Sequence, residues 1–122
     1  MLRERLREIL RGTSAEDLLE PLEELLVRLI VKFKPVRILI SGSLARRRFV
    51  RGLSDIDVLV IVDYDIPRDL RFELATVKDV DVEITVISEG ELERALSEGR
   101  EFYVDAVKCG VEVYSGGQPL RE

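Results

Sequence analysis

Two aspartates, Asp55 and Asp57, stand two residues apart where an almost continuous apolar run, 56–62, begins. If that run is a β-strand, both side chains leave the same face, about 6.6 Å apart at the backbone. Two carboxylates this close repel each other unless a cation neutralises them, and carboxylate oxygens are ligands that Mg²⁺ prefers. The pair therefore indicates a site for one or two Mg²⁺ ions.

A glycine–serine pair, Gly42 and Ser43, lies between the branched apolar stretch 36–40 and the helix-forming residues 44–48. A glycine after a strand permits a tight turn and a close approach of the backbone to a ligand. The first N–H groups of a following helix are unpaired and can bind a phosphate, to which the Ser43 hydroxyl and the Arg46 guanidinium can add contacts. The pattern is typical of a phosphate-binding turn.

Hydrophobic periodicity predicts the helices and strands that must position these residues. Helices are expected at 2–11, from a cap at Thr13 or Ser14 to residues 32–34, at 89–97 and at 101–108. Strands are expected at 36–40, 56–62, 80–87 and 111–114, whereas 68–78 is ambiguous between a helix and irregular structure. Pro21 either kinks the second helix or marks its true start.

These elements predict an α/β fold, a small mixed sheet of about four strands packed by helices. The 122 residues suffice for one core, so we expect a single domain over 1–122. Its N-terminal helices would occupy about 2–34 and its catalytic core about 36–114.

The composition excludes several kinds of chemistry. The chain has no histidine, so a Ser-His-Asp triad, a Cys-His pair and a histidine-ligated zinc site are excluded. The single cysteine, Cys109, cannot form an internal disulfide or a cysteine-rich metal site, so any metal must be held by oxygen. The net charge of −5 argues against broad binding to duplex nucleic acid. No apolar stretch suits a signal peptide or a membrane span, and we expect a soluble, cytoplasmic protein.

The run 42–46 (Gly-Ser-Leu-Ala-Arg), followed by 54–60 (Ser-Asp-Ile-Asp-Val-Leu-Val), resembles the signature of the DNA polymerase beta-type nucleotidyltransferase superfamily. The small stand-alone MNT proteins of archaea and bacteria are the members that the chain resembles most. The resemblance covers about 36–83 and extends more weakly through 102–114 to the last strand. It implies that Gly42 and Ser43 bind a nucleoside triphosphate and that Asp55 and Asp57 hold the metal ions.

The resemblance also implies a third carboxylate, on a later strand, that completes the metal site and takes the proton from the attacking hydroxyl. The expected strand 80–87 offers Asp81 and Glu83 on one face, because they are two residues apart. Glu83 is the first choice, since counting back from the strand end at Ser88 puts it where the family usually has its acidic residue. Asp81 is the second choice.

Arg47 departs from the family pattern, in which a glycine commonly follows the Ala-Arg pair. If this position needs a positive φ, an arginine costs about 1 kcal/mol or more. Its side chain either obstructs the triphosphate or adds a phosphate contact. The neighbouring arginines have a plain alternative as a solvated helix face: Arg46, Arg47, Arg48 and Arg51.

The resemblance implies a reaction in which two Mg²⁺ ions assist transfer of a nucleoside monophosphate, with AMP from ATP as the expected group, to an acceptor hydroxyl. The chain is too short for a separate substrate domain, so acceptor recognition must come from a homo-oligomer or a partner protein. MNT proteins are typically encoded with a HEPN-domain partner as antitoxin and toxin. The alternative is a catalytically inactive domain of the same fold that binds and masks a partner.

Overall fold

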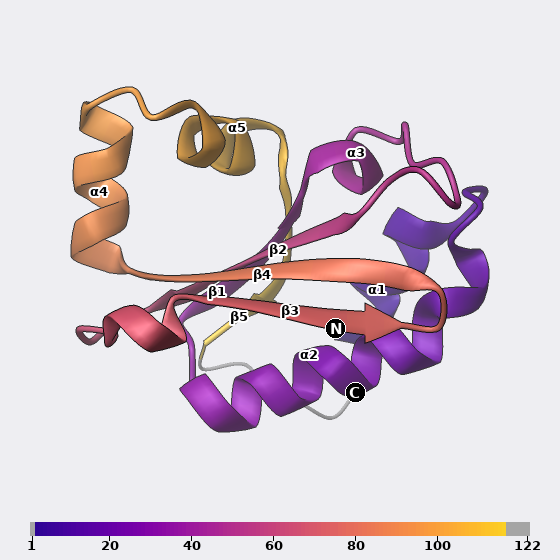
Figure 1. Cartoon of the computed structure of the whole chain (residues 1–122), viewed down its shortest axis with the longest axis horizontal. Helices are drawn as coiled ribbons and strands as arrows, with labels where there is room; N and C mark the ends of the chain where they lie inside the picture. The colour runs from indigo at the N-terminus through magenta and orange to yellow at the C-terminus, as the bar shows by residue number, and fades with distance from the viewer. Residues whose placement is uncertain (1, 117–122) are drawn as a thin grey trace.

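The computed structural model describes residues 2–116 and alternates helices with the strands of one sheet (Figure 1). The helices are α1 (Leu2–Leu10), α2 (Leu19–Phe33), α3 (Gly42–Ala45), α4 (Glu89–Ser97) and α5 (Glu101–Cys109). The strands are β1 (Arg37–Ser41), β2 (Ile56–Val62), β3 (Phe72–Val77), β4 (Val80–Ser88) and β5 (Val111–Ser115). Single 3₁₀ turns occur at Glu16–Leu18 and Arg68–Leu70.

The five strands form a mixed sheet in the order β3-β4-β2-β1-β5. Strand β2 runs parallel to β4, and the other neighbouring pairs are antiparallel. The α/β fold with a mixed sheet is confirmed, but the expected count of about four strands is one too low. The missing strand is β3, within the ambiguous segment 68–78. It joins β4 through a two-residue turn in which Lys78 has a φ of +56°.

Helices cover the two faces of the sheet unequally. In Figure 1, α2 lies below the sheet, and α4 and α5 lie above it. The face toward α1 and α2 forms the larger core, whereas the opposite face packs a smaller cluster around Leu39, Leu59 and Ile61 against α4 and α5. Strand β2 is buried from both sides, which explains its nearly continuous apolar sequence.

Two predicted helices differ from expectation at their ends. Thr13 and Ser14 do not cap α2, because a 3₁₀ turn intervenes and α2 begins at Leu19. Pro21 lies in the first turn of α2, where its missing N–H leaves no hydrogen bond unmade. The expected helix 44–48 is instead the single turn α3, which ends before Arg47 because that residue has a φ of +59°.

Within residues 2–116, no helix combines the length and the apolar composition needed to cross a bilayer.

Candidate active site

The turn between β1 and α3 is packed directly against Asp57. Strands β1 and β2 are antiparallel, and their register sets Ser41, the last residue of β1, opposite Asp57. Gly42 follows with a φ of +71°, and a Cβ built on it would lie 2.2 Å from Oδ2 of Asp57. A side chain at Gly42 would be strained by the backbone conformation, and the Asp57 carboxylate would have to shift to make room for it.

Glu83 lies beside Asp57 on the neighbouring strand. The parallel pairing of β2 with β4 sets Asp57 opposite Glu83, so both side chains leave the same face of the sheet. Asp81 shares that face, but its carboxylate is exposed, and the Thr76 hydroxyl donates to it at 3.5 Å. The register thus brings Glu83 next to Asp57 and leaves Asp81 nearer the end of the strand.

The three carboxyl groups repel one another. Burial raises the pKa of Asp57, the charge of Asp55 raises it further, and a hydrogen bond with Glu83 offsets part of the rise. Burial also raises the pKa of Glu83, as do its hydrogen bond with Asp55 and the negative charges of both aspartates. No ion pair within residues 2–116 involves Asp55, Asp57 or Glu83. The site therefore holds excess negative charge.

A strand, a glycine turn, two aspartates and a glutamate one strand away are the arrangement that the sequence signature implies. Residues 22–115 match the family described as the nucleotidyltransferase domain. The chain belongs to this nucleotidyltransferase family. It is thus a small nucleotidyltransferase of the polymerase beta-like superfamily. A search of curated proteins found no match to the chain.

The acidic residues of this nucleotidyltransferase suit a divalent metal ion by charge and by ligand type. A hydrogen bond between two carboxyl groups needs a shared proton, and a bound cation can replace that proton. In the described part of the chain, no group of three or more acidic or cysteine side chains is placed to hold a metal ion.

The two arginines nearest the turn have partners within the nucleotidyltransferase fold. Arg46 forms an ion pair with Asp105 of α5, so its guanidinium is engaged between α3 and α5. Arg47 donates to the backbone carbonyls of Ile9, at 3.3 Å, and of Arg11. From the sequence, the Arg47 side chain was expected either to obstruct the triphosphate or to contact a phosphate. In the structure it instead binds the end of α1. Ser43 is half-buried in the first turn of α3.

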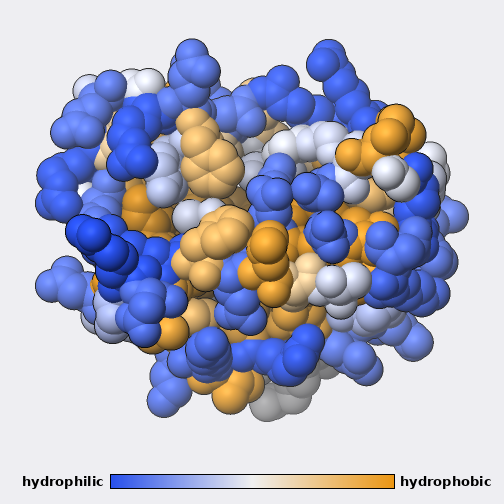
Figure 2. All heavy atoms as spheres, in the orientation of Figure 1, coloured by the Kyte–Doolittle hydropathy of each residue, from blue (hydrophilic) through white to orange (hydrophobic). Residues whose placement is uncertain are grey.

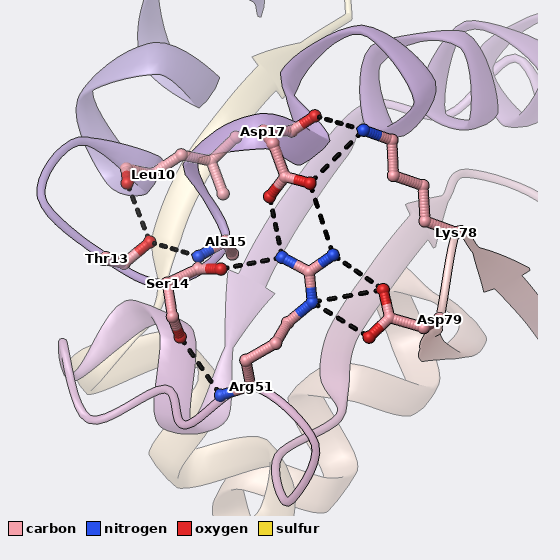
Figure 3. Close-up of polar contacts among 8 residues, drawn as sticks. All are labelled: Leu10, Thr13, Ser14, Ala15, Asp17, Arg51, Lys78 and Asp79. Atoms are coloured by element: carbon pink, nitrogen blue, oxygen red, sulfur yellow. Dashed lines mark hydrogen bonds and ion pairs between the residues drawn. The ribbon is translucent and has the colours of Figure 1, made fainter.

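Arg51 is a residue whose importance the sequence did not reveal. Figure 3 shows its guanidinium between two carboxylates, with Nη1 2.7 Å from Asp17 Oδ1 and Nη2 2.6 Å from Asp79 Oδ1. Its Nη1 also donates to the Ser14 carbonyl at 2.7 Å, and Lys78 Nζ lies 3.2 Å from Asp17 Oδ2. This network, called the Arg51 network below, is not a solvated helix face.

The Arg51 network ties together three segments of the chain. Arg51 lies in the loop that leads to Asp55, Asp17 lies before α2, and Asp79 lies in the turn that begins β4. The strands that begin at these points carry Asp57 and Glu83. The Arg51 network therefore fixes the starts of both acid-bearing strands relative to each other.

A groove of about 500 Å³ lies beside Glu83. Glu83 and Thr85 of β4 form part of its lining, together with Phe72 of β3 and residues of α4 and α5. On the α5 side, the rings of Phe102 and Tyr103 pack edge to face with their centroids 5.0 Å apart. The groove adjoins the acidic residues and opens to solvent.

Proposed function

We propose that this nucleotidyltransferase transfers AMP from ATP to an acceptor hydroxyl in a Mg²⁺-dependent reaction. The observation that carries the proposal is the Asp57 carboxylate packed against Gly42 and next to Glu83, with no ion pair to either acid within residues 2–116. The Gly42–Ser43 turn would hold the triphosphate. Asp55, Asp57 and Glu83 would hold two Mg²⁺ ions, which supply positive charge to the phosphates and to the leaving group.

The reaction is a displacement at the α-phosphorus of ATP. The acceptor oxygen forms a bond to that phosphorus and gives its proton to the Glu83 carboxylate. The bond from the α-phosphorus to the bridging oxygen breaks, and pyrophosphate leaves with the electron pair. Gly42 contributes a turn without a side chain, against which the Asp57 carboxylate packs directly.

The acceptor that we propose is a hydroxyl group on another protein. The described residues form one sheet with its covering helices and contain no separate lobe above the acidic residues that could present an acceptor. The resemblance to MNT proteins favours a HEPN-domain partner, in a toxin–antitoxin pair, or a second copy of the chain.

A second candidate is a domain that binds and masks such a partner without catalysis. It is favoured by one observation, the absence from residues 2–116 of a cluster already arranged to hold a metal ion.

Calorimetric titration of ATP, with and without Mg²⁺, separates the two candidates. We expect roughly micromolar affinity that requires Mg²⁺ and is lost in the Asp55→Ala/Asp57→Ala variant. The matched control is Asp63→Ala/Asp65→Ala, which removes two exposed aspartates of the same spacing just after β2. Affinity that is independent of Mg²⁺, or equal in both double variants, would contradict the enzyme proposal and favour the binding module.

A further inference from the structure

The two edges of the sheet differ in what covers them. The order β3-β4-β2-β1-β5 leaves β3 at one edge and β5 at the other. At the β5 edge, Arg5 of α1 donates to the backbone carbonyl of Glu112 at 2.8 Å, so a side chain occupies part of that edge. At the β3 edge, four of the six residues are exposed: Phe72, Glu73, Leu74 and Thr76. Strand β3 is therefore the more open edge of the sheet.

Every second residue of β3 points its backbone groups away from the sheet. The two-residue turn pairs Val77 with Val80, and the Arg71 carbonyl accepts from the Val86 N–H at 2.8 Å. The odd-numbered residues of this segment therefore bond to β4, because hydrogen-bonded positions alternate along an antiparallel pair. Outward-facing N–H and C=O groups, to which no hydrogen bond within residues 2–116 is made, belong to Phe72, Leu74 and Thr76.

The side chains of this edge also suit pairing with another strand. Phe72 is 55% exposed and Leu74 is 64% exposed. Figure 2 shows apolar side chains at the surface in the middle of the face on which Figure 1 draws β3. Edge strands commonly resist pairing by means of lysines, prolines or bulges, and β3 contains none of these. Its one charged residue, Glu73, has Lys32 Nζ of α2 3.7 Å from its Oε1.

A second copy of the chain offers the same open strand, and one antiparallel register suits both copies. When Leu74 lies opposite Leu74 of the second copy, Phe72 of each copy lies opposite Thr76 of the other. All these positions have outward-facing backbone groups, so about six backbone hydrogen bonds can form between the copies. In the same register, Glu73 lies opposite the small side chain of Ala75.

Neighbouring registers are less favourable. A register centred on Glu73 would set the two Glu73 carboxylates directly opposite each other, and like charges in that position destabilise a sheet. A shift the other way would set Phe72 opposite Lys78, which has a φ of +56° and lies outside the strand. In the register centred on Leu74, the two Glu73 carboxylates are only diagonal neighbours, and each has Lys32 beside it. Charges of both signs therefore meet near the two-fold axis.

We infer that two copies of the chain pair through β3 in this register, as an antiparallel two-fold dimer that joins their sheets into one. Because Arg5 covers part of the β5 edge, each chain offers one open strand and the assembly closes at two copies. The dimer goes beyond the proposed function and does not depend on it. Glu83 lies opposite Leu74 in the pairing of β3 with β4. Both candidate active sites thus open on the same face, with the two Glu83 backbones three strand spacings, about 14 Å, apart.

Sedimentation of the full chain over a range of concentrations tests the dimer. We expect a monomer–dimer equilibrium with a dissociation constant of roughly 10 µM, as for an interface below the standard size. Leu74→Lys and Leu74→Glu should each weaken it about tenfold or more, because each sets like charges opposite each other at the axis. An equimolar mixture of the two variants should restore dimers, since lysine then faces glutamate. Val107→Lys is the control, because Val107 is 38% exposed on α5, which packs over β1.

Amide hydrogen exchange of the wild type tests the register without any variant. The outward-facing N–H groups of Phe72, Leu74 and Thr76 should exchange more slowly as the protein concentration rises. Those of Glu73 and Ala75, already bonded to β4, should change little. A chain that sediments as a monomer throughout, or as larger oligomers, would overturn the inference. So would a dimer that Leu74→Lys leaves intact, exchange that is independent of concentration, or a mixture of folded variants that stays monomeric.

Discussion

Two acidic regions of this molecule differ in how their charges are balanced. In the Arg51 network, hydrogen bonds from Arg51 hold the pKa values of Asp17 and Asp79 below their usual range. At the candidate active site, burial and acidic neighbours raise the pKa values of Asp57 and Glu83. The first region stabilises the ionised carboxylates, and the second opposes ionisation.

This difference distinguishes acidic residues that stabilise the fold, Asp17 and Asp79, from acidic residues suited to bind a cation, Asp57 and Glu83. Asp79 and Glu83 are four residues apart, yet within residues 2–116 only Asp79 of the two has an arginine partner. A protein can retain like charges together without a cation only at a cost in stability, and such groups concentrate at functional sites. The unbalanced region is therefore the candidate for Mg²⁺, and the balanced region is its support.

The largest effect is expected from Asp57→Asn, which reduces the negative charge of the unbalanced region. Transfer of AMP should fall by about 100-fold or more, with loss of Mg²⁺-dependent ATP binding. Without divalent cations the variant should be more stable than wild type at pH 7, because one repelling, partly buried charge is gone. Nucleotidyl-transfer assays and thermal unfolding with and without Mg²⁺ measure both effects. Asp63→Asn is the control. If Asp57→Asn binds ATP as tightly as wild type does, Asp57 is not a ligand of the metal ion.

The next comparison, Glu83→Gln against Asp81→Asn, tests which acid completes the unbalanced region. Glu83→Gln should lower transfer about 100-fold, since the amide neither accepts the hydroxyl proton nor carries the charge for a metal ion. Asp81→Asn should change transfer less than about twofold, because its side chain interacts with Thr76 at the strand end. Steady-state assays of both variants decide the matter. A larger loss in Asp81→Asn would make Asp81 the third carboxylate.

A smaller effect is expected from Arg51→Gln, which leaves Asp17 and Asp79 without their shared cation. The variant should be less stable than wild type at pH 7 and should lose up to about tenfold in transfer as the starts of β2 and β4 loosen. Arg51→Lys should recover only part of this loss, because lysine cannot bridge two carboxylates bidentately.

The stabilisation that Arg51 provides through Asp17 and Asp79 should depend on pH. Because the folded-state pKa values of Asp17 and Asp79 are lowered, their stabilising contribution is present above pH about 4 and is lost as the pH falls further. Denaturant unfolding at several pH values should show wild type and Arg51→Gln converging in acid. A constant difference from pH 7 to pH 3 would contradict the assigned role of the Arg51 network.

The fold was largely predictable because most of its elements bury a regular apolar pattern. The helix expected at 89–97 is α4, with Ser88 accepting a hydrogen bond from Glu91 N at its start. Strand β3 was not predicted because it lies at the sheet edge. Phe72 and Leu74 remain exposed there, so its sequence shows no clear alternation of apolar and polar residues. The hydrophobic pattern of a sequence reflects which side chains are buried, and an edge strand buries few of them.

For the candidate site, the sequence allows predictions only about residues that are close to one another along the chain. Asp55 and Asp57 are close in sequence, so strand geometry alone predicts a shared face for them, although β2 begins at Ile56, one residue after Asp55. The choice between Glu83 and Asp81 depends on the register of β2 against β4, a tertiary property. Arg51 lies 34 residues from Asp17 and 28 from Asp79, and no local signal joins positions so far apart.

The smallest effect is expected at Arg47, a cation that belongs to neither acidic region. Arg47→Gly should change Mg²⁺-dependent ATP affinity less than about twofold, because the arginine side chain is bound to backbone carbonyls at the end of α1. Stability should change little, since relief of the left-handed backbone gains about 1 kcal/mol and the lost hydrogen bonds cost about as much. Calorimetry and thermal unfolding measure the two quantities.

Arg47→Ala supplies the matched control, because it removes the same hydrogen bonds and keeps a side chain at a φ of +59°. Alanine should therefore destabilise the protein more than glycine does, while both leave ATP affinity unchanged. A large rise in ATP affinity in both variants would mean that the arginine obstructs the triphosphate. Equal destabilisation by alanine and glycine would mean that the left-handed conformation at this position carries no strain.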